Sequence, residues 1–328
     1  MAEEEPSSLA SIARSQCLPA KEFEKQYKDH LSGFREWDQL THAEEWLLFP
    51  DNIGANLSID EVAVSNGELY TIVTNKAAHG RKKALVSIVK GTKANEVSLV
   101  LEKIPADRRN LVTEVTLDMS PAMEAIVRQS FPSAILVTDR FHVQQLVGEA
   151  VQDVRVTLRR EALQEENAAI KQCRQEKRRY QPTVFENGDT KKQLLARSHH
   201  LLFKPENRWH ESQQQRANIL FEVFPELHTA YRLSLMFRSC YENSHSIPEA
   251  KVALDKWYAK VEEKRNEPFL VVAESLRLHE TTLLNYFLHR STNASAESFN
   301  AKLKGFRALV RGVRDKKFFL FRVATLFG

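Results

Sequence analysis

Cysteine is scarce in this sequence. Cys17, Cys173 and Cys240 are the three cysteines among 328 residues, and they lie far apart along the chain. Neither a disulfide framework nor a zinc knuckle is indicated, because both need cysteines at paired spacings. The scarcity fits a reducing compartment, and we expect a cytoplasmic protein.

Long apolar runs are also missing. The sequence opens with Glu3, Glu4 and Glu5 instead of a basic stretch followed by an apolar segment, and no apolar run approaches the length that spans a bilayer. We therefore expect a protein that is neither exported nor inserted in a membrane. With 42% hydrophobic and 27% charged residues, the chain is predicted to fold rather than to be disordered.

A large excess of one charge is absent as well, since the formal net charge is +4. The distribution is uneven, however. Residues 299–328 carry eight basic side chains against one acid, Asp315. This end suits a polyanion such as DNA, although a solvated basic helix face explains the charge run equally well.

Three short antiparallel strands are predicted first. Residues 57–64 alternate in the manner of a strand, and the Asn66-Gly67 pair that follows is a strong hairpin signal. Residues 68–74 and 84–89 provide the second and third strands. A helical arm is expected before them, over residues 1–50.

Two further strands are expected to be joined through helices. A helix follows Lys93, and residues 112–117 then form a strand that ends at Asp118. Ser120 and Pro121 are typical of a helix start. A fifth strand, residues 134–138, ends at Asp139. The resulting order, β-β-β-α-β-α-β, is similar to that of an RNase H-like core, and ligand sites tend to lie near the carboxyl ends of such strands.

The predicted fold class is α/β: an RNase H-like mixed five-stranded sheet flanked by helices, with a large all-α insertion before the last catalytic helix. The first part of the core is expected over residues 51–150, and the insertion over residues 151–290. Residues 291–328 are expected to supply the catalytic helix and the basic tail of the core.

Three acids are candidates for holding Mg²⁺, which prefers oxygen ligands. Asp60 lies within an apolar strand, where a charge is costly unless it is solvated, paired or bound to a cation. Asp118 ends a strand, and Glu297 lies near the start of a helix. Each has a structural alternative: a wet sheet face for Asp60, a helix cap for Asp118 and an ordinary surface position for Glu297. Their combination favours a metal site.

Asp139 and His142 form a second candidate pair at the start of the helix after the fifth strand. They either assist the site or act as a helix cap beside a packed histidine. Gly91-Thr92-Lys93 lacks the upstream glycine of a phosphate-binding loop, which excludes that class of nucleotide site.

These stretches together resemble the insertion-sequence DDE transposases whose RNase H-like domain carries a helical insertion before the last acid. The resemblance covers roughly residues 45–328. It is carried by Ser58-Ile59-Asp60-Glu61, Thr116-Leu117-Asp118-Met119-Ser120-Pro121, Thr138-Asp139-Arg140-Phe141-His142 and Asn293-Ala294-Ser295-Ala296-Glu297-Ser298-Phe299-Asn300-Ala301-Lys302-Leu303-Lys304.

The resemblance implies that Asp60, Asp118 and Glu297 are the catalytic, metal-binding triad. Two Mg²⁺ ions are expected, with Mn²⁺ as a substitute. Asp139 and His142 are implied to be accessory residues. The polar and basic residues after the glutamate are implied to face DNA: Asn300, Lys302, Lys304, Arg307, Arg311 and Arg314.

The function expected from these features is cleavage and strand transfer at insertion-sequence ends, with DNA ends and target DNA as partners and a nucleoid-associated location. At least a dimer is expected in the DNA complex. The rivals are an RNase H-like nuclease or resolvase without strand transfer, and a non-catalytic DNA-binding protein derived from a transposase. Little room precedes Asp60 for an end-binding module, so we expect it on a separate polypeptide, or else a shortened copy.

Overall fold

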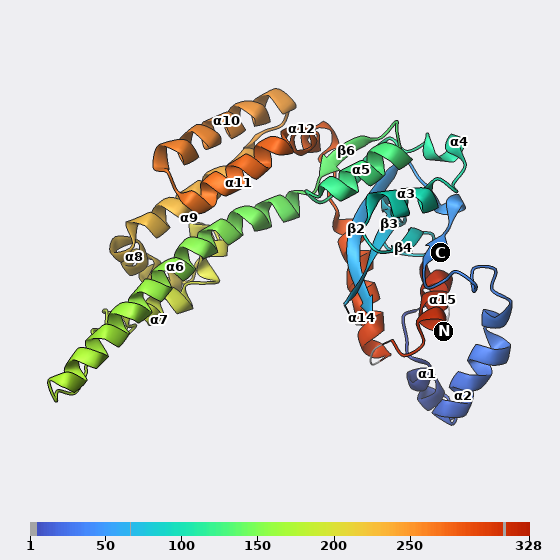
Figure 1. Cartoon of the computed structure of the whole chain (residues 1–328), viewed down its shortest axis with the longest axis horizontal. Helices are drawn as coiled ribbons and strands as arrows, with labels where there is room; N and C mark the ends of the chain where they lie inside the picture. Colours follow the sequence, from blue (N-terminus) through green and yellow to red (C-terminus); the bar gives the residue numbers. More distant parts are fainter. Residues whose placement is uncertain (1–4, 66, 311–312) are drawn as a thin grey trace. The chain divides into compact units, whose positions relative to one another are not determined.

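The structure is a computed structural model that describes residues 5–65, 67–310 and 313–328. Its internal contacts divide the chain into two compact units. The first unit joins the described residues as far as Arg140 with His289–Gly328, and the second unit is Phe141–Leu288. Figure 1 shows the sheet within the first unit and a set of helices in the second. The sheet-containing unit is therefore assembled from two stretches far apart in sequence.

The first unit is built on one mixed sheet of six strands in the order β1-β4-β3-β2-β5-β6. The central strand β2 pairs antiparallel with β3 and parallel with β5, and β5 pairs parallel with β6. This arrangement is compatible with an RNase H-like fold. The strands are β1 (Trp46–Leu48), β2 (Asn56–Ser65), β3 (Glu68–Asn75), β4 (Leu85–Lys90), β5 (Glu114–Leu117) and β6 (Ile135–Thr138).

The prediction of five strands is wrong by one. β1 is an edge strand that pairs antiparallel with β4 and places Leu47 opposite Ile88. The sequence analysis included these residues in a helical arm, because three residues are too few to show the alternation of a strand. Asn66 of the predicted hairpin lies outside the described residues, although β2 and β3 pair on both sides of it, with Ser65 opposite Glu68.

Helices cover both faces of the sheet (Figure 1). Alternate residues of β2 point to different cores: Leu57 and Ile59 join one cluster, whereas Val62 and Val64 join the other. The first cluster includes residues of α3 (Ala94–Leu101) and α5 (Pro121–Ser130), and α4 (Ala106–Arg109) follows α3. The second includes residues of α14 (Ala294–Leu309) and α15 (Lys316–Phe327). Ser120 caps α5 as predicted, since its hydroxyl accepts from the Met123 N–H.

A half-buried lysine lies against the α14-covered face of the sheet. Lys76 begins a short 3₁₀ turn (Lys76–Ala78) after β3, and its Nζ donates to Thr116 Oγ1 at 2.7 Å. The same ammonium lies 3.3 Å from Glu114 Oε1, and the two side chains are 13% and 4% exposed. Burial lowers the pKa of Lys76, and the Glu114 carboxylate opposes that shift. The pair therefore ties the end of β3 to β5.

The N-terminal segment packs on the C-terminal helix of the same unit. It contains α1 (Leu9–Ser15), α2 (Ala20–Gln26), a π turn (Tyr27–Leu31) and a 3₁₀ turn (Phe34–Glu36). The Phe34 ring lies 5.2 Å from that of Phe318 and 5.4 Å from that of Phe321 in α15. Arg322 of the predicted basic tail is buried, with its guanidinium over the rings of Tyr27 and Phe306. The part of that tail that forms α15 thus belongs largely to the core rather than to a DNA-facing surface.

The second unit is helical. Its longest helix, α6, runs over Arg140–Gln175 and is rich in charge. Among the described residues, no helix combines the length and apolar composition that crossing a bilayer requires. The remaining helices are α7 (Lys191–Arg197), α8 (Glu211–Val223), α9 (Pro225–Asn243), α10 (Ile247–Lys264), α11 (Glu267–Leu278), α12 (Glu280–Leu284) and α13 (Tyr286–His289).

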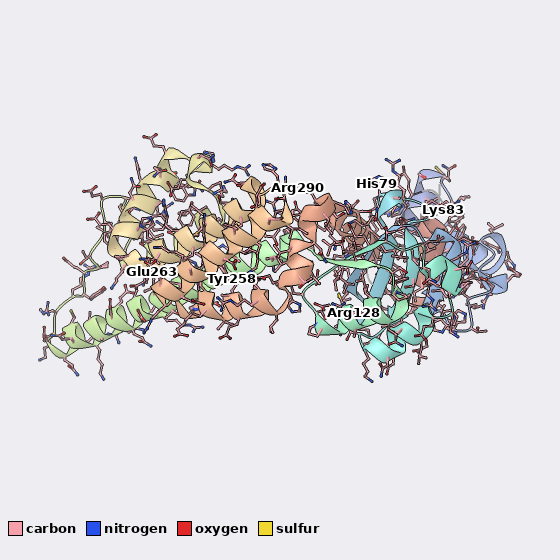
Figure 2. The ribbon with its side chains drawn as sticks, turned by 90° about the horizontal axis from the view of Figure 1, so that it is seen from above. His79, Lys83, Arg128, Tyr258, Glu263 and Arg290 are labelled. Atoms are coloured by element: carbon pink, nitrogen blue, oxygen red, sulfur yellow. The ribbon has the colours of Figure 1, made fainter. Side chains whose placement is uncertain are left out.

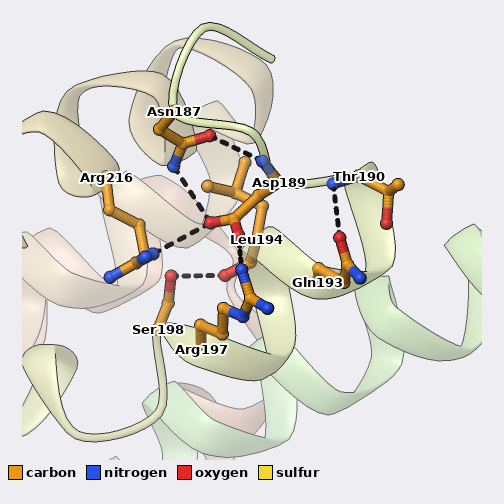
Figure 3. Close-up of polar contacts among 8 residues, drawn as sticks. All are labelled: Asn187, Asp189, Thr190, Gln193, Leu194, Arg197, Ser198 and Arg216. Carbon is orange, nitrogen blue, oxygen red and sulfur yellow. Dashed lines mark hydrogen bonds and ion pairs between the residues drawn. The ribbon is translucent and has the colours of Figure 1, made fainter. Parts of the chain in front are cut away.

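A buried carboxylate ties α7 to α8. Asp189, which is fully buried, lies just before α7 and pairs with Arg197 of that helix (Figure 3). Its Oδ2 also accepts from Arg216 Nε in α8 at 3.0 Å and from Asn187 Nδ2 at 2.9 Å. Several donors therefore converge on one side chain, which satisfies a charge that burial alone would disfavour.

Replacing Asp189 with Ala is expected to lower the free energy of unfolding of the second unit by about 2 kcal/mol or more. Arg216, 22% exposed, would keep its charge without a counterion, and the more exposed Arg197 contributes less. Urea unfolding followed by circular dichroism measures the change. Asp255→Ala, which breaks an exposed pair with Lys251 in the same unit, should cost only about 0.5 kcal/mol. Equal losses for the two variants would contradict the role assigned to Asp189.

Replacing Lys76 with Met is expected to destabilise the first unit by about 3 kcal/mol, because it leaves Glu114 buried without its cation. The double variant Lys76→Met/Glu114→Gln removes both charges and should recover most of that loss. Chemical denaturation of the two variants and the parent gives the comparison. If the double variant is as unstable as the single one, charge pairing is not what Lys76 contributes.

Candidate functional site

Three aspartates lie at one level of neighbouring strands. Ser58 in β2 pairs with Thr116 in β5, and Leu117 in β5 pairs with Thr138 in β6. Extending these two registers by two residues and by one residue places Asp60, Asp118 and Asp139 side by side, since parallel pairing advances both strands equally. The sequence predicted the acids at these strand positions, and the pairing of the strands brings them into one row.

All three aspartates belong to the face of the sheet that α14 covers. Side chains alternate between faces along a strand. Ser58, two residues before Asp60, contacts Asn293 at the start of α14, and Thr116, two residues before Asp118, contacts Lys76. Asp60 and Asp118 are half-buried and Asp139 is buried. Solvent therefore reaches the row at Asp60 and Asp118, whereas the row is enclosed at Asp139.

Asp60 is held by α14. Its Oδ2 accepts a hydrogen bond from Asn300 Nδ2, and its Oδ1 accepts from the Glu61 N–H at 2.7 Å. Asn300 is itself 8% exposed. Together with the contact between Ser58 and Asn293, this bond fixes the helix to β2 at two points. Desolvation, followed by the charge of Asp60, raises the pKa of Glu61.

Glu297 lies between the two anchored positions of the helix. Asn293, Glu297 and Asn300 stand at spacings of four and three residues, which places them on one stripe of an α-helix. The Glu297 N–H bonds to the Asn293 carbonyl at 2.9 Å, so the residue is within the regular helix. Glu297 therefore lies on α14 between the two residues that contact Ser58 and Asp60 of β2. Its carboxylate is exposed to solvent.

A group of possible metal ligands contains the accessory pair. Ligand atoms of Asp118, Asp139 and His142 all lie within 4.8 Å of one another. The Asp139 N–H donates to the Leu117 carbonyl at 2.9 Å, which continues the β5–β6 ladder, and His142 follows in the first turn of α6. Sequence reasoning grouped Asp118 with Asp60 and Glu297, and treated Asp139 with His142 separately. Within the described residues, Asp118 joins the two groups.

The residues predicted to face DNA differ in their surroundings. Lys302 Nζ donates to the Gly80 carbonyl at 2.7 Å and Arg307 Nη1 to the Ala63 carbonyl at 2.9 Å, so both hold α14 against the rest of the unit. Lys304 and Arg314 are exposed. Asn300 binds Asp60, as described above, and Arg311 lies outside the described residues.

A basic loop was missed by the sequence analysis. Residues 76–84 connect β3 to β4, and within them Arg81, Lys82 and Lys83 are consecutive and exposed. The signal in the sequence is this run of three bases after Gly80. The run alone does not indicate a DNA-binding site, because short charge runs are common in surface loops. The run is also far from Glu297 along the chain.

The donor set suits a hard divalent cation. Carboxylate oxygens are the ligands that Mg²⁺ and Mn²⁺ prefer, and the aspartate row offers several of them at one sheet level. The imidazole of His142 is a better match to Mn²⁺ than to Mg²⁺. The arrangement therefore fits metal-assisted chemistry at a phosphate ester better than nucleophilic catalysis by a side chain.

Comparison with known proteins agrees with this reading. The profile of the family DDE_Tnp_ISL3, described as transposase, matches residues 57–323. The "Transposase for insertion sequence element IS1001" of Bordetella parapertussis is 23% identical over 274 residues, which cover 83% of this chain. The match spans 60% of that relative's length. Because the profile covers most of the chain and includes every predicted acid, the chain belongs to the ISL3-type family of insertion-sequence DDE transposases.

Proposed function

We propose that this chain carries the catalytic centre of DNA transposition: metal-dependent cleavage at insertion-sequence ends, followed by strand transfer into target DNA. The observation that carries the proposal is the register that aligns Asp60 with Asp118, together with the attachment of the Glu297 helix to Asp60 through Asn300. Asp60 and Asp118 stand at one sheet level, and Glu297 lies on the helix that is anchored to Asp60. Such a set leaves room for phosphate and water between carboxylates.

Asp60, Asp118 and Glu297 are the residues that we assign to metal binding, with Mg²⁺ as the expected ion. When bound, a pair of such ions supplies Lewis-acid stabilisation of the attacking and leaving oxygens of a phosphodiester. The protein orients the ligands: the Asn300 amide and the Glu61 N–H hold the two oxygens of Asp60. The Glu297 carboxylate is exposed and therefore accessible to a metal ion or to DNA.

The reaction proceeds in two displacements at phosphorus. A water first attacks the phosphodiester at the end of the element, forms a bond to phosphorus and releases a 3′ hydroxyl. That hydroxyl then attacks a target phosphodiester and displaces its 3′ oxygen, so the number of phosphodiester bonds is unchanged in the second step. Catalysis by the chain consists of positioning and charge stabilisation. Because two ends must be joined, at least two copies are expected in the DNA complex.

The triad is tested by Asp60→Asn, Asp118→Asn and Glu297→Gln, each made singly. Every variant is expected to lose about 1000-fold in cleavage rate, since a lost metal ligand removes several kcal/mol of transition-state stabilisation. The assay uses labelled duplexes carrying the ends of the insertion sequence that encodes the chain, a supercoiled target plasmid, and Mg²⁺ or Mn²⁺. DNA affinity is measured in parallel.

Asp107→Asn is the matched control, because Asp107 is an exposed acid in α4 that lies outside the acid row. It should cut like the parent. Cleavage that survives in a triad variant contradicts the assignment of that residue. Products that contain nicks without joined strands would favour the nuclease alternative over strand transfer.

A further inference from the structure

The loop between β3 and β4 presents a concentrated positive charge. Arg81, Lys82 and Lys83 are three consecutive exposed bases, and His79 beside them is also exposed. Among the ion pairs between described residues, none includes Arg81, Lys82 or Lys83. Three permanent charges in the loop are thus available to an anionic partner.

The loop lies against the helix of the proposed catalytic glutamate. Gly80 adopts φ +67°, and a Cβ added to it would stand 3.3 Å from Phe299 N and 3.4 Å from Ser298 Oγ. The Gly80 carbonyl accepts from Lys302 Nζ at 2.7 Å. Ser298 immediately follows Glu297 in α14. The basic residues therefore begin one residue after a glycine that touches the neighbour of Glu297.

The loop is also held at its other end and within itself. Lys76 is bonded to Thr116, two residues before Asp118. The Ala77 N–H bonds to Asn75 Oδ1 at 3.0 Å, and two backbone bonds of 3.0 Å, from Arg81 to Ala78 and from Ala84 to Arg81, close successive turns. One short segment thus contacts both the strand of Asp118 and the helix of Glu297, with a backbone that is already ordered.

The charges of the site explain why such a loop is needed. Asp60, Asp118, Asp139 and Glu297 repel the phosphates of any DNA brought to them. On α14, Lys302 and Arg307 each donate to a protein carbonyl, which orients both side chains towards the protein. Cations from a neighbouring element add to the exposed Lys304 of α14 in drawing a phosphate backbone towards the acids.

We propose that Arg81, Lys82 and Lys83 bind the phosphate backbone of DNA beside the catalytic site. The proposal rests on the proposed function, since it takes Glu297 as part of that site. Arginine can grip a phosphate with two parallel N–H donors, whereas lysine acts as a point charge. Interactions of this kind release counterions and carry no sequence information. Figure 2 shows His79 and Lys83 near one another on this edge of the first unit.

The experiment measures binding of a fluorescein-labelled 30-base-pair duplex of arbitrary sequence by anisotropy, from about 50 to 300 mM NaCl. The variant Arg81→Gln/Lys82→Gln/Lys83→Gln is expected to bind about 500-fold more weakly at 0.1 M salt. Its plot of log K against log salt concentration should be shallower by about 3, because the loop would no longer neutralise one phosphate with each of its bases. Circular dichroism and thermal unfolding confirm that the exposed loop substitutions leave the fold intact.

Two matched variants make the result specific. Lys103→Gln/Arg108→Gln/Arg128→Gln removes the same charge from the α3–α5 side of the sheet, where Arg128 lies in Figure 2, and should change neither affinity nor slope by much. Arg81→Lys/Lys82→Arg/Lys83→Arg keeps the loop charge and should keep the parent's slope. An unchanged slope in the loop variant, or equal losses in both neutralised variants, overturns the proposal.

The outcome is separable from that of the triad. Loss of cleavage in the Asp60, Asp118 and Glu297 variants with unchanged loop-dependent binding would support both assignments. If the triad variants cut like the parent while the loop variant binds DNA more weakly, the proposed function is wrong and the loop proposal stands. Triad-dependent cleavage with no loop-dependent binding would sink the loop proposal alone.

Discussion

The attachment of α14 to β2 is the contact on which the acid site depends. The chain leaves the first unit after Arg140 and returns at His289, so the sheet cannot place Glu297 by local connection. Asn293 and Asn300 do so by bonding to Ser58 and Asp60, while Phe299, Leu303 and Phe306 bury the same helix in the core. The polar contacts fix the position of the helix along β2, and the buried apolar side chains fix which face of the helix is turned to the core.

The gathering of like charges constrains what surrounds them. A carboxylate row on a partly buried sheet face is unfavourable without cations or hydrogen-bond donors. Lys76 supplies a half-buried positive charge next to Glu114, and its ammonium also interacts with Asp139. The Asn300 amide and the Glu61 N–H supply donors to Asp60 without charge. These two neutral donors bind the Asp60 carboxylate without adding a positive charge that would compete with a metal ion.

The sequence predicted the features that are local. Alternation in residues 57–64 indicated β2, short β runs indicated the other four longer strands, and Ser120 with Pro121 marked the start of α5. The register that aligns Asp118 with Asp139 depends on strand pairing, so it could not be calculated from spacing. Lys302, Arg307 and Arg322 looked like surface bases because charge says nothing about which carbonyl or ring a side chain will meet. Long side chains bury their stems readily, which is why basic runs predict DNA contact poorly.

Phosphate binding by the basic loop would not select a DNA sequence. Its backbone is ordered by its own hydrogen bonds, so binding DNA would cost mainly the side-chain entropy of Arg81, Lys82 and Lys83. Phosphate contacts position a duplex without reading it, and acids that hold metal ions act on the same sequence-independent backbone. Selection of an element's ends requires groups that reach base edges. In the roles proposed for them, the triad and the loop contact only the backbone, so reading an element's ends would need other residues.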